Sequence, residues 1–537
     1  MQHFPLHFVP LEQDVLSLCL DDSFKDLYLV RLRTLISCLR TNKIQGKDPT
    51  SIFLAAQALM PIQQTHGLFP RIIGKGDNAH RLMELLLRMR TEAAADELTT
   101  SKYGLMPSAS IESLIIIDRE VDYATVLLTQ LTYEGLLDEM FGITHNQAEI
   151  DTSIVGPAPG TQQAGKGAAA PIQQGLKRKI QLDSSDKLYE QIRDANGAIV
   201  DGLLNKVARR LQSDMDSRHT KTSVSELKDF VGKLSGYQSE QQSLKIHINL
   251  IEEIMKSTQS DIFRRNLEVQ QNLYDGSDPS YQHDTIEELI CRDVPLITVL
   301  RLLCLESCIS GGLRSRDLDN FKRLILQAYG YQHLLTFSAL EKIGLLQTRA
   351  SANVLMNPLG VGTGVPEGSK TNYNYLRKVL RLVVDEVNEQ NPNDIAYVYS
   401  GYAPLSVRLV QSIIQKQHLL TITKGTSAAS NGTSSAAHGW QGFEDALRNV
   451  KGATFNKVQK GEEAATKARH MLVGAGGKVK TVVVMFLGGI TFTEIAALRF
   501  IAKQLEGSKK ILICTTDVIS GDKMMEAAIE KGDFGKV

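Results

Sequence analysis

Blocks of apolar and polar residues alternate along the chain, and the clearest block begins at residue 114. Residues 114–117 (LIII) form a short apolar run typical of a buried strand. Charged residues follow at once, and beyond them leucines are spaced for one face of a helix. The pattern therefore predicts a strand, a charged turn and a helix. The leucines on the predicted helix face are Leu127, Leu128, Leu131, Leu136 and Leu137.

Similar patterns occur towards both ends of the chain, where predicted strands and helices alternate as in a parallel α/β sheet. The predicted strands are 7–20 (strand or extended loop), 395–399, 481–487 and 510–514, and the predicted helices are 51–60, 79–90, 375–386, 405–415 and 493–505.

The middle of the chain is predicted to be helical. From residue 184 to about 346, apolar residues recur mostly at steps of three and four. Residues 224–234 and 244–255 predict two helices with a break at Ser235 and Gly236, which makes an αα-hairpin with a polar tip. On pattern alone this hairpin is either part of an ordinary bundle or a binding arm.

Segments rich in Gly, Ala, Pro and Ser at 151–176, 348–370 and 424–438 are typical of loops. The α/β patterns thus lie on both sides of an all-α block. We expect an α/β fold in which a discontinuous, mostly parallel sheet domain (1–145 and 373–537) holds an inserted all-α domain (146–372).

Composition narrows the function classes. Sixty Lys and Arg balance sixty Asp and Glu, which disfavours a generic binder of nucleic acid or anionic membranes. The six cysteines lack CxxC spacing, so we expect neither disulfides nor a zinc site, and a reducing compartment such as the cytosol. The first residues predict no signal peptide, and no apolar run reaches the ~18 residues of a membrane span.

Two kinds of feature could carry chemistry. Asp118, Arg119 and Asp122 follow the strand at 114–117, where open α/β sheets bind ligands. These charges suit either a hydrolase acid pair or an ion pair that pins a strand to a helix. The glycine turns at 74–78, which includes Lys75, and at 488–489 open predicted helices, as phosphate loops do.

No complete catalytic motif accompanies these features. The turn at 74–78 lacks the GxxxxGK[ST] spacing, and the turn at 488–489 lacks a nucleophile elbow. The residues alone leave a non-catalytic binding protein and an α/β nucleotide-binding enzyme as alternatives. We expect neither a cofactor nor a metal.

Three longer segments carry a family resemblance. Residues 118–143 (DREVDYATVLLTQLTYEGLLDEMFGI), 387–411 (VNEQNPNDIAYVYSGYAPLSVRLVQ) and 486–500 (FLGGITFTEIAALRF) resemble, in order, signature segments of the SM-protein (Sec-1/Munc-18-like) family, nearest its vacuolar-sorting members. The resemblance covers most of the chain outside the three loops. It implies a discontinuous sheet domain with an inserted helical domain, in agreement with the pattern.

The resemblance also implies a function. Proteins of this family are not enzymes; they bind SNARE helices, of Qa and R type, and template their assembly before membrane fusion. The vacuolar members belong to the HOPS tethering complex, and commonly to CORVET, beside a subunit resembling vacuolar protein sorting-associated protein 16. The resemblance therefore implies a cytoplasmic protein that reaches late-endosomal and vacuolar or lysosomal membranes only through partners and binds no nucleic acid.

The family's binding regions map onto this sequence. The SNARE-carrying hairpin corresponds to residues 224–255, and an amphipathic partner helix needs the kind of apolar stripe that this hairpin offers. The partner subunit docks in the family near 345–376, with Tyr373 and Leu376 as candidate anchors here. The candidate SNARE contacts are Leu227, Phe230, Val231, Leu234, Tyr237 and Leu244.

The chain departs from the family in three places. We expect it to lack the family's N-terminal α/β domain, so that the cleft beside that domain is absent or incomplete. Residues 30–46 interrupt a stretch that otherwise resembles the family. Our hypothesis is that these residues come from a retained intron or a mispredicted exon. A transcript lacking these codons would support it. Val126 replaces a usual proline and should alter only the start of a helix.

The family resemblance favours one role for the charged residues at the end of the 114–117 strand. With no nucleophile, metal ligand or phosphate loop to serve, Asp118, Arg119 and Asp122 are best explained as a structural polar lock. We predict that the lock holds the 114–117 strand against the helix that contains Leu131 and Leu136.

Overall fold

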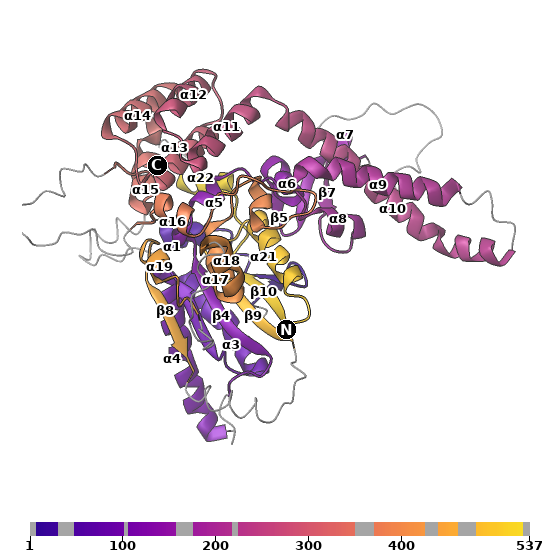
Figure 1. Cartoon of the computed structure of the whole chain (residues 1–537), viewed down its shortest axis with the longest axis horizontal. Helices are drawn as coiled ribbons and strands as arrows, with labels where there is room; N and C mark the ends of the chain where they lie inside the picture. Colours follow the sequence, from indigo (N-terminus) through magenta and orange to yellow (C-terminus); the bar gives the residue numbers. More distant parts are fainter. Residues whose placement is uncertain are drawn as a thin grey trace, which may run out of the picture.

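A computed structural model describes residues 7–29, 48–100, 106–156, 176–216, 224–349, 370–424, 439–459 and 479–529, with the side chains of 94–100 and 214–235 left out. The interruption at residues 30–46 and most of the three predicted loops lie outside these ranges. In Figure 1 a sheet with its helices forms the lower body, a group of helices lies above it, and two long helices project sideways.

A seven-stranded sheet is built from both chain ends, as the sequence predicts. Its order is β1-β2-β10-β9-β4-β3-β8, and every neighbouring pair is parallel except the pairs β1–β2 and β3–β8 at the two edges. The strands are β1 Val9–Pro10, β2 Val15–Ser17, β3 Arg71–Lys75, β4 Ile111–Asp118, β8 Thr454–Val458, β9 Lys480–Leu487 and β10 Lys509–Thr515.

The centre of the sheet pairs the first and second parts of the chain directly. Strand β4 lies beside β9, and the side chains of Leu114, Ile115 and Ile116 have no exposed surface. Continuous apolar runs of this kind are typical of parallel strands covered on both faces. Helix α4 (Asp77–Thr100) packs on β3 and β4, and α21 (Phe492–Gln504) packs on β10.

Several local predictions are wrong. Residues 395–399 form a 3-10 helix, η6 (Ile395–Tyr399), whose start is capped by the Asp394 carboxylate, which accepts a hydrogen bond from Ala396 N. The prediction of a strand failed because a short apolar run does not by itself distinguish strand from helix. The predicted leucine-faced helix is two helices, α5 (Ala124–Leu127) and α6 (Tyr133–Phe141). Thr132 caps the start of α6 by accepting a hydrogen bond from Gly135 N.

The inserted part is not all-α. Its strands β6 (Gln147–Asp151) and β7 (Lys177–Gln181) form a three-stranded antiparallel sheet with β5 (Ile143–Thr144), which lies just before it. Strands β6 and β7 were not predicted because each carries few apolar residues. The helices that follow are α7 Thr152–Val155, α8 Lys187–Ile192, α9 Gly197–Asp216, α10 Val224–Thr258, α11 Asp261–Asp275, α12 Ser280–Cys291, α13 Leu296–Ser310, α14 Ser315–Tyr329 and α15 Leu334–Ile343.

The predicted break at Ser235 and Gly236 is also wrong. Both residues lie inside α10, a continuous helix of 35 residues that is about 50 Å long. A glycine inside a helix is destabilising by only ~1 kcal/mol relative to alanine, so the helix continues through it. The hairpin is instead formed by α9 and α10, and we call this pair the arm (Figure 1).

The insertion contacts the sheet domain through α13. Helix α13 packs on α5 and on the later elements α16 (Tyr373–Val379) and α22 (Gly521–Ala528). The other helices of the body are α1 Ser23–Tyr28, α3 Thr50–His66, α17 Leu405–Ile414, α18 Lys416–Lys424 and α19 Glu444–Arg448, with the 3-10 turns η1 Arg119–Val121 and η4 Tyr331–His333.

Candidate functional site

The predicted charges at the end of β4 are fully occupied by hydrogen bonds within the chain. The Asp118 carboxylate accepts hydrogen bonds from Tyr28 OH and from Asn78 N, the latter at 2.7 Å. Burial, with the neighbouring Glu120 carboxylate, raises the pKa of Asp118. Gly76 passes so close, with φ at 111°, that a Cβ there would lie 2.1 Å from the Asp118 side chain. The Asp118 carboxylate is therefore enclosed by the chain and accepts its hydrogen bonds from within it.

Arg119 makes a buried ion pair with the second part of the chain. Its guanidinium donates to both carboxylate oxygens of Glu494 on α21, at 2.8 and 3.0 Å, and to Asp122 O at 2.7 and 3.0 Å. The Arg119 and Glu494 side chains have no exposed surface. Burial alone would lower the pKa of Arg119, but Glu494 and Asp122 outweigh it and raise that pKa. The arginine is thus held charged in the interior.

Asp122 completes the cluster. Its carboxylate accepts hydrogen bonds from Thr125 N at 3.1 Å, from Ser406 N at 3.0 Å and from the Tyr373 hydroxyl. Tyr373 begins α16 and Ser406 lies on α17, so Asp122 joins the first part of the chain to the segments that follow the insertion.

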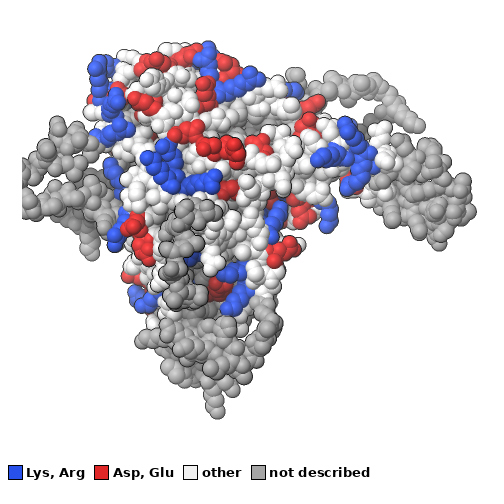
Figure 2. Space-filling model, viewed as in Figure 1, with Lys and Arg blue, Asp and Glu red and all other residues white. Residues whose placement is uncertain are grey.

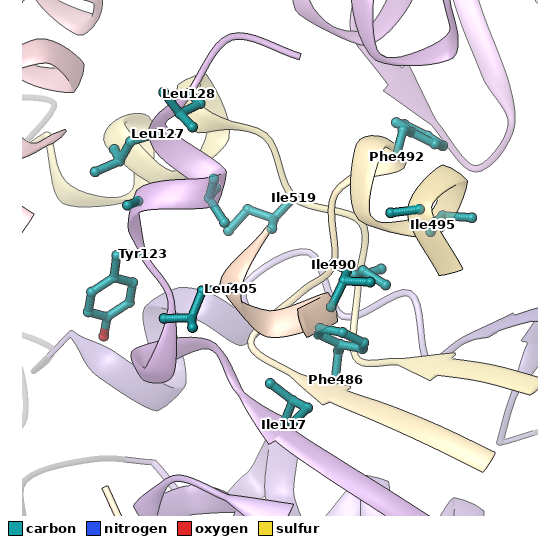
Figure 3. Close-up of a cluster of buried hydrophobic side chains, with 14 of the residues drawn as sticks. Ile117, Tyr123, Leu127, Leu128, Leu405, Phe486, Ile490, Phe492, Ile495 and Ile519 are labelled. Atoms are coloured by element: carbon teal, nitrogen blue, oxygen red, sulfur yellow. The ribbon is translucent and has the colours of Figure 1, made fainter. Parts of the chain in front are cut away.

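The three residues therefore form a polar cluster, but its partners differ from the prediction. Asp118, Arg119 and Asp122 contact α1, α4, α16, α17 and α21 rather than the helix with Leu131 and Leu136. The surrounding space is filled by apolar side chains from β4, β9, α5, α17 and α21, among them Ile117, Phe486, Leu405 and Ile495 (Figure 3). The end of the strand is a packed junction.

Asp118→Ala is expected to lower thermal stability. The change leaves Tyr28 OH and Asn78 N without their acceptor, and each such buried donor is worth about 1–3 kcal/mol. A drop of several degrees in the melting temperature, measured by differential scanning fluorimetry, is the expected result. Unchanged melting would contradict the structural role of Asp118.

The candidate phosphate turns are occupied by the chain itself. At 74–78, Gly74 and Lys75 lie in β3, and the Asp77 and Asn78 amides that begin α4 donate to the carboxylates of Glu120 and Asp118. Lys75 Nζ donates to Leu447 O, Gly452 O and Thr454 Oγ1 at 2.6–3.0 Å, and burial lowers its pKa to about 8.

The second turn is filled in the same manner. A Cβ on Gly488, whose φ is 81°, would lie 2.5 Å from the Tyr28 ring, and one on Gly489 would lie 2.7 Å from Ile519. These glycines are close packing points, and both turns disfavour the nucleotide-binding alternative. Among the described residues, no group of three His, Cys, Asp or Glu side chains is placed to hold a metal ion.

The arm is anchored at its base by a buried polar cluster. His247 on α10 bonds Tyr133 OH at 2.9 Å and Asp186 Oδ2 at 3.2 Å, and its ring stacks on Tyr189. Burial opposes the charge of Asp186, but hydrogen bonds from His247 and Ser243 outweigh it and hold its pKa at about 2. These contacts fix the direction of α10 relative to α6 and α8.

The candidate SNARE contacts lie along α10 but differ in exposure. Leu227, Phe230, Val231 and Leu234 belong to the helix, and their side chains lie outside the described residues. Tyr237 is half-buried against the core. Leu244 is only 7% exposed because it faces the neighbouring helices of the insertion. The prediction that it contacts a SNARE therefore needs correction.

The two candidate anchors for a partner subunit are also buried. Tyr373 is 6% exposed and donates its hydroxyl to Asp122, and Leu376 has no exposed surface. Both face the core because α16 packs on α13, so the structure does not offer them as surface anchors. Residues 350–369 of the predicted docking segment lie outside the described ranges.

Sequence reasoning missed a groove at the base of the arm. It has a volume of about 410 Å³ and lies between the start of α9, the end of α10 and α11 on one side and Leu131, Leu136 and Ser400 of the body on the other. Ile251 and Ile254 are buried in its wall, and Met255 at its rim is 40% exposed. The signal available in the sequence was the helical spacing of Ile251, Ile254 and Met255, which places these apolar residues on neighbouring faces of α10.

The surface carries charges of both signs. Figure 2 shows Lys and Arg mixed with Asp and Glu over the body and the upper helices, and basic side chains over the arm, where Lys206, Arg209 and Arg210 are exposed on α9. Within the ranges that the structure covers, no helix is long and apolar enough to cross a membrane.

Sequence comparison adds a consistent group of relatives. A family model described as the Sec1 family matches residues 1–527. The chain is 36% identical over 530 residues to vacuolar protein sorting-associated protein 33A of Rattus norvegicus, an alignment that covers 99% of this chain and 77% of the relative. It is 33% identical over 531 residues to vacuolar protein sorting-associated protein 33 of Schizosaccharomyces pombe, with 98% and 77% covered.

Structural comparison shows the SM-protein fold. The SM protein Vps45 in complex with the Qa SNARE Tlg2 superposes with a TM-score of 0.59 and 14% identity, covering 97% of this chain and 74% of that one. The Unc18 chain of the Unc18–syntaxin 1 complex from Monosiga brevicollis gives 0.55 and 15%, covering 97% and 76%. The expectation of a missing first domain gains no support from these comparisons.

Proposed function

Since this chain belongs to the Sec1 family, we propose that it is a SNARE-binding chaperone that promotes SNARE assembly and membrane fusion in vacuolar protein transport. The relatives are named for vacuolar protein sorting, and the structural neighbours include complexes with Qa SNAREs. The role is non-catalytic. Its strongest structural support is the arm, a pair of long helices that projects from the body (Figure 1).

The arm suits a helical partner for physical reasons. Amphipathic helices bind grooves through apolar residues at helical spacing. Residue 248 of α10 is an isoleucine that is 37% exposed, and Met255, two turns further on, is 40% exposed. At the strand ends, by contrast, the candidate polar groups are occupied by partners within the chain.

We further propose membership of a tethering complex. By family resemblance this is HOPS, with CORVET as a second assembly, and the adjacent subunit resembles vacuolar protein sorting-associated protein 16. Such a protein would act in the cytoplasm at the surface of late endosomes and vacuoles or lysosomes. Because Tyr373 and Leu376 are buried, exposed residues near them, such as Tyr375 at 36%, are better candidates for the subunit contact.

A direct binding measurement tests the proposed function. Purified chain is titrated into fluorescently labelled Qa and R SNARE motifs from the same organism, and binding is read as fluorescence anisotropy, with a sequence-scrambled motif as the control. We expect saturable binding to at least one motif and none to the scrambled peptide. Equal signals for native and scrambled motifs would contradict the proposal. A calorimetric titration with ATP and GTP should show no binding.

A further inference from the structure

Strand β7 is the open edge of the small sheet near the base of the arm (Figure 1). The order β5-β6-β7 leaves one side of β7 without a neighbouring strand in the part of the chain that the structure describes. On its other side β7 pairs with β6, and it also packs on α7. An edge strand of five residues has the length and the backbone groups to receive an extended peptide as a further strand.

The register shows which backbone groups of β7 point to the open edge. Thr152 N donates to Leu176 O at 2.9 Å, just beyond the paired residues of β6 and β7. In an antiparallel ladder, hydrogen-bonded pairs alternate with pairs that are not bonded to each other. Lys177, Lys179 and Gln181 therefore direct their N–H and C=O groups away from β6. Among the described residues, no backbone group outside the ladder bonds them.

The exposed face of this sheet carries its charges in rows. Glu149 on β6 lies opposite Lys179 on β7, and their side chains form an ion pair at 3.3 Å. Asp151 lies opposite Lys177 in the same register. The β6 row is thus acidic and the β7 row is basic. Opposite charges on neighbouring strands stabilise a sheet and like charges destabilise it, so an acidic row suits the next position outward.

We propose that β7 binds an extended acidic peptide of another protein as a fourth strand of this sheet. The peptide backbone pairs with the outward groups of Lys177, Lys179 and Gln181. Carboxylates two residues apart lie beside the two lysines, because side chains two apart share one face of a strand. A second copy of β7 is disfavoured, since it would place lysines against lysines. The proposal does not depend on helix binding by the arm.

The spacing of charges in the peptide tests the lysine row. The labelled peptide SGTVEVEVTGS places both glutamates on one face of a strand, whereas SGTVVEEVTGS has the same composition with the glutamates on opposite faces. Binding to the full chain is read as fluorescence anisotropy at low salt. We expect saturable binding of the first peptide and binding weaker by at least about threefold for the second. Equal affinities would overturn the assignment of the lysine row.

Neutral side chains test the two lysines themselves. The variant Lys177→Gln, Lys179→Gln should bind SGTVEVEVTGS at least about fivefold more weakly, because both cross-strand charge pairs are lost. Both lysines are exposed, so the fold should persist, which differential scanning fluorimetry checks. The matched control Arg88→Gln, Lys503→Gln removes the same charge from side chains that are 76% and 74% exposed. It should bind as the wild type does, and equal losses in both variants would overturn the proposal.

A proline on the edge tests the backbone pairing. Gln181→Pro removes an N–H that points away from β6, so the ladder and both lysines remain. Affinity for SGTVEVEVTGS should fall by about threefold, since one hydrogen bond is lost. In amide hydrogen exchange at single-residue resolution, the bound peptide should slow exchange at Lys177 and Lys179. Unchanged exchange at both positions would overturn strand addition.

A lipid surface is the competing occupant of the same lysines. If vesicles containing phosphatidylserine sediment the wild-type chain but not the Lys177→Gln, Lys179→Gln variant, and neither peptide binds, the lysines contact anionic headgroups, against the proposal. Absence of SGTVEVEVTGS binding at millimolar peptide would also overturn it. The SNARE titration is a separate measurement on the wild-type chain, so a failure here leaves the proposed function standing.

Discussion

Glu494→Ala is expected to destabilise the protein by about 3–5 kcal/mol, because the buried Arg119 guanidinium loses the carboxylate that accepts two of its hydrogen bonds and keeps only Asp122, at 3.9 Å, as a counter-ion. Ser406 Oγ and Thr491 N, which donate to the same carboxylate, lose their acceptor as well. For a domain of this size the change corresponds to a fall of roughly 10 °C in the melting temperature. Differential scanning fluorimetry and circular dichroism measure it.

A matched control separates the effect of losing a buried ion pair from that of losing an exposed one. Glu149→Ala removes the partner of Lys179 in an ion pair whose side chains are 55% and 68% exposed, and exposed pairs contribute at most about 1 kcal/mol. The double variant Arg119→Met, Glu494→Met should recover part of the lost stability, since the arginine charge is removed together with its main partner, although the buried Asp122 carboxylate then loses its cation. Equal melting temperatures for Glu494→Ala and Glu149→Ala would contradict the assignment of Arg119 and Glu494 as the lock between the two parts of the sheet domain.

The second large effect concerns the outer half of α10. Changing Leu227, Val231 and Leu234 together to aspartate should reduce affinity for the SNARE motif by at least about a hundredfold, because three apolar positions at helical spacing are lost from one side of the arm. Fluorescence anisotropy measures the affinity, and circular dichroism shows whether the helix persists.

The control for this variant carries the same added charge. Gln212 and Ser213 on α9 and Ser239 on α10 are exposed, and changing them to aspartate adds three carboxylates without removing an apolar group. This control should bind nearly as well as the wild-type chain. If the control loses as much affinity as the apolar variant, added negative charge explains the loss and the apolar contact assignment fails.

The sheet was predictable from the sequence because its central strands carry a strong local signal. Residues 114–117 and 481–487 are continuous apolar runs, and parallel strands buried on both faces require such runs. The polar nature of the lock was also readable, since Asp118, Arg119 and Asp122 directly follow a strand. Its partners were not, because Tyr28, Ser406 and Glu494 come from segments up to hundreds of residues away.

Local pattern misled where tertiary contacts decide the outcome. The apolar run at 395–399 is buried as a 3-10 helix, and the Ser235–Gly236 pair lies inside a helix that packs on α9. Leu244, Tyr373 and Leu376 are apolar or aromatic residues at helical spacing, and spacing alone does not distinguish a face turned to a partner from one turned to the chain's own core. The groove combines residues from four helices and from four segments outside them, so no single stretch of sequence displays it.

Photo-crosslinking tests most directly whether the arm, rather than the strand-end cluster, is the binding part of the molecule. A benzophenone-bearing residue is placed singly at Gln238 or Met255 on α10 and at Lys451, which pairs with Glu120 beside the strand end. Each protein is irradiated with a labelled SNARE motif. We predict covalent adducts from positions 238 and 255 and none from 451. Adducts from 451 with none from the arm would contradict the account.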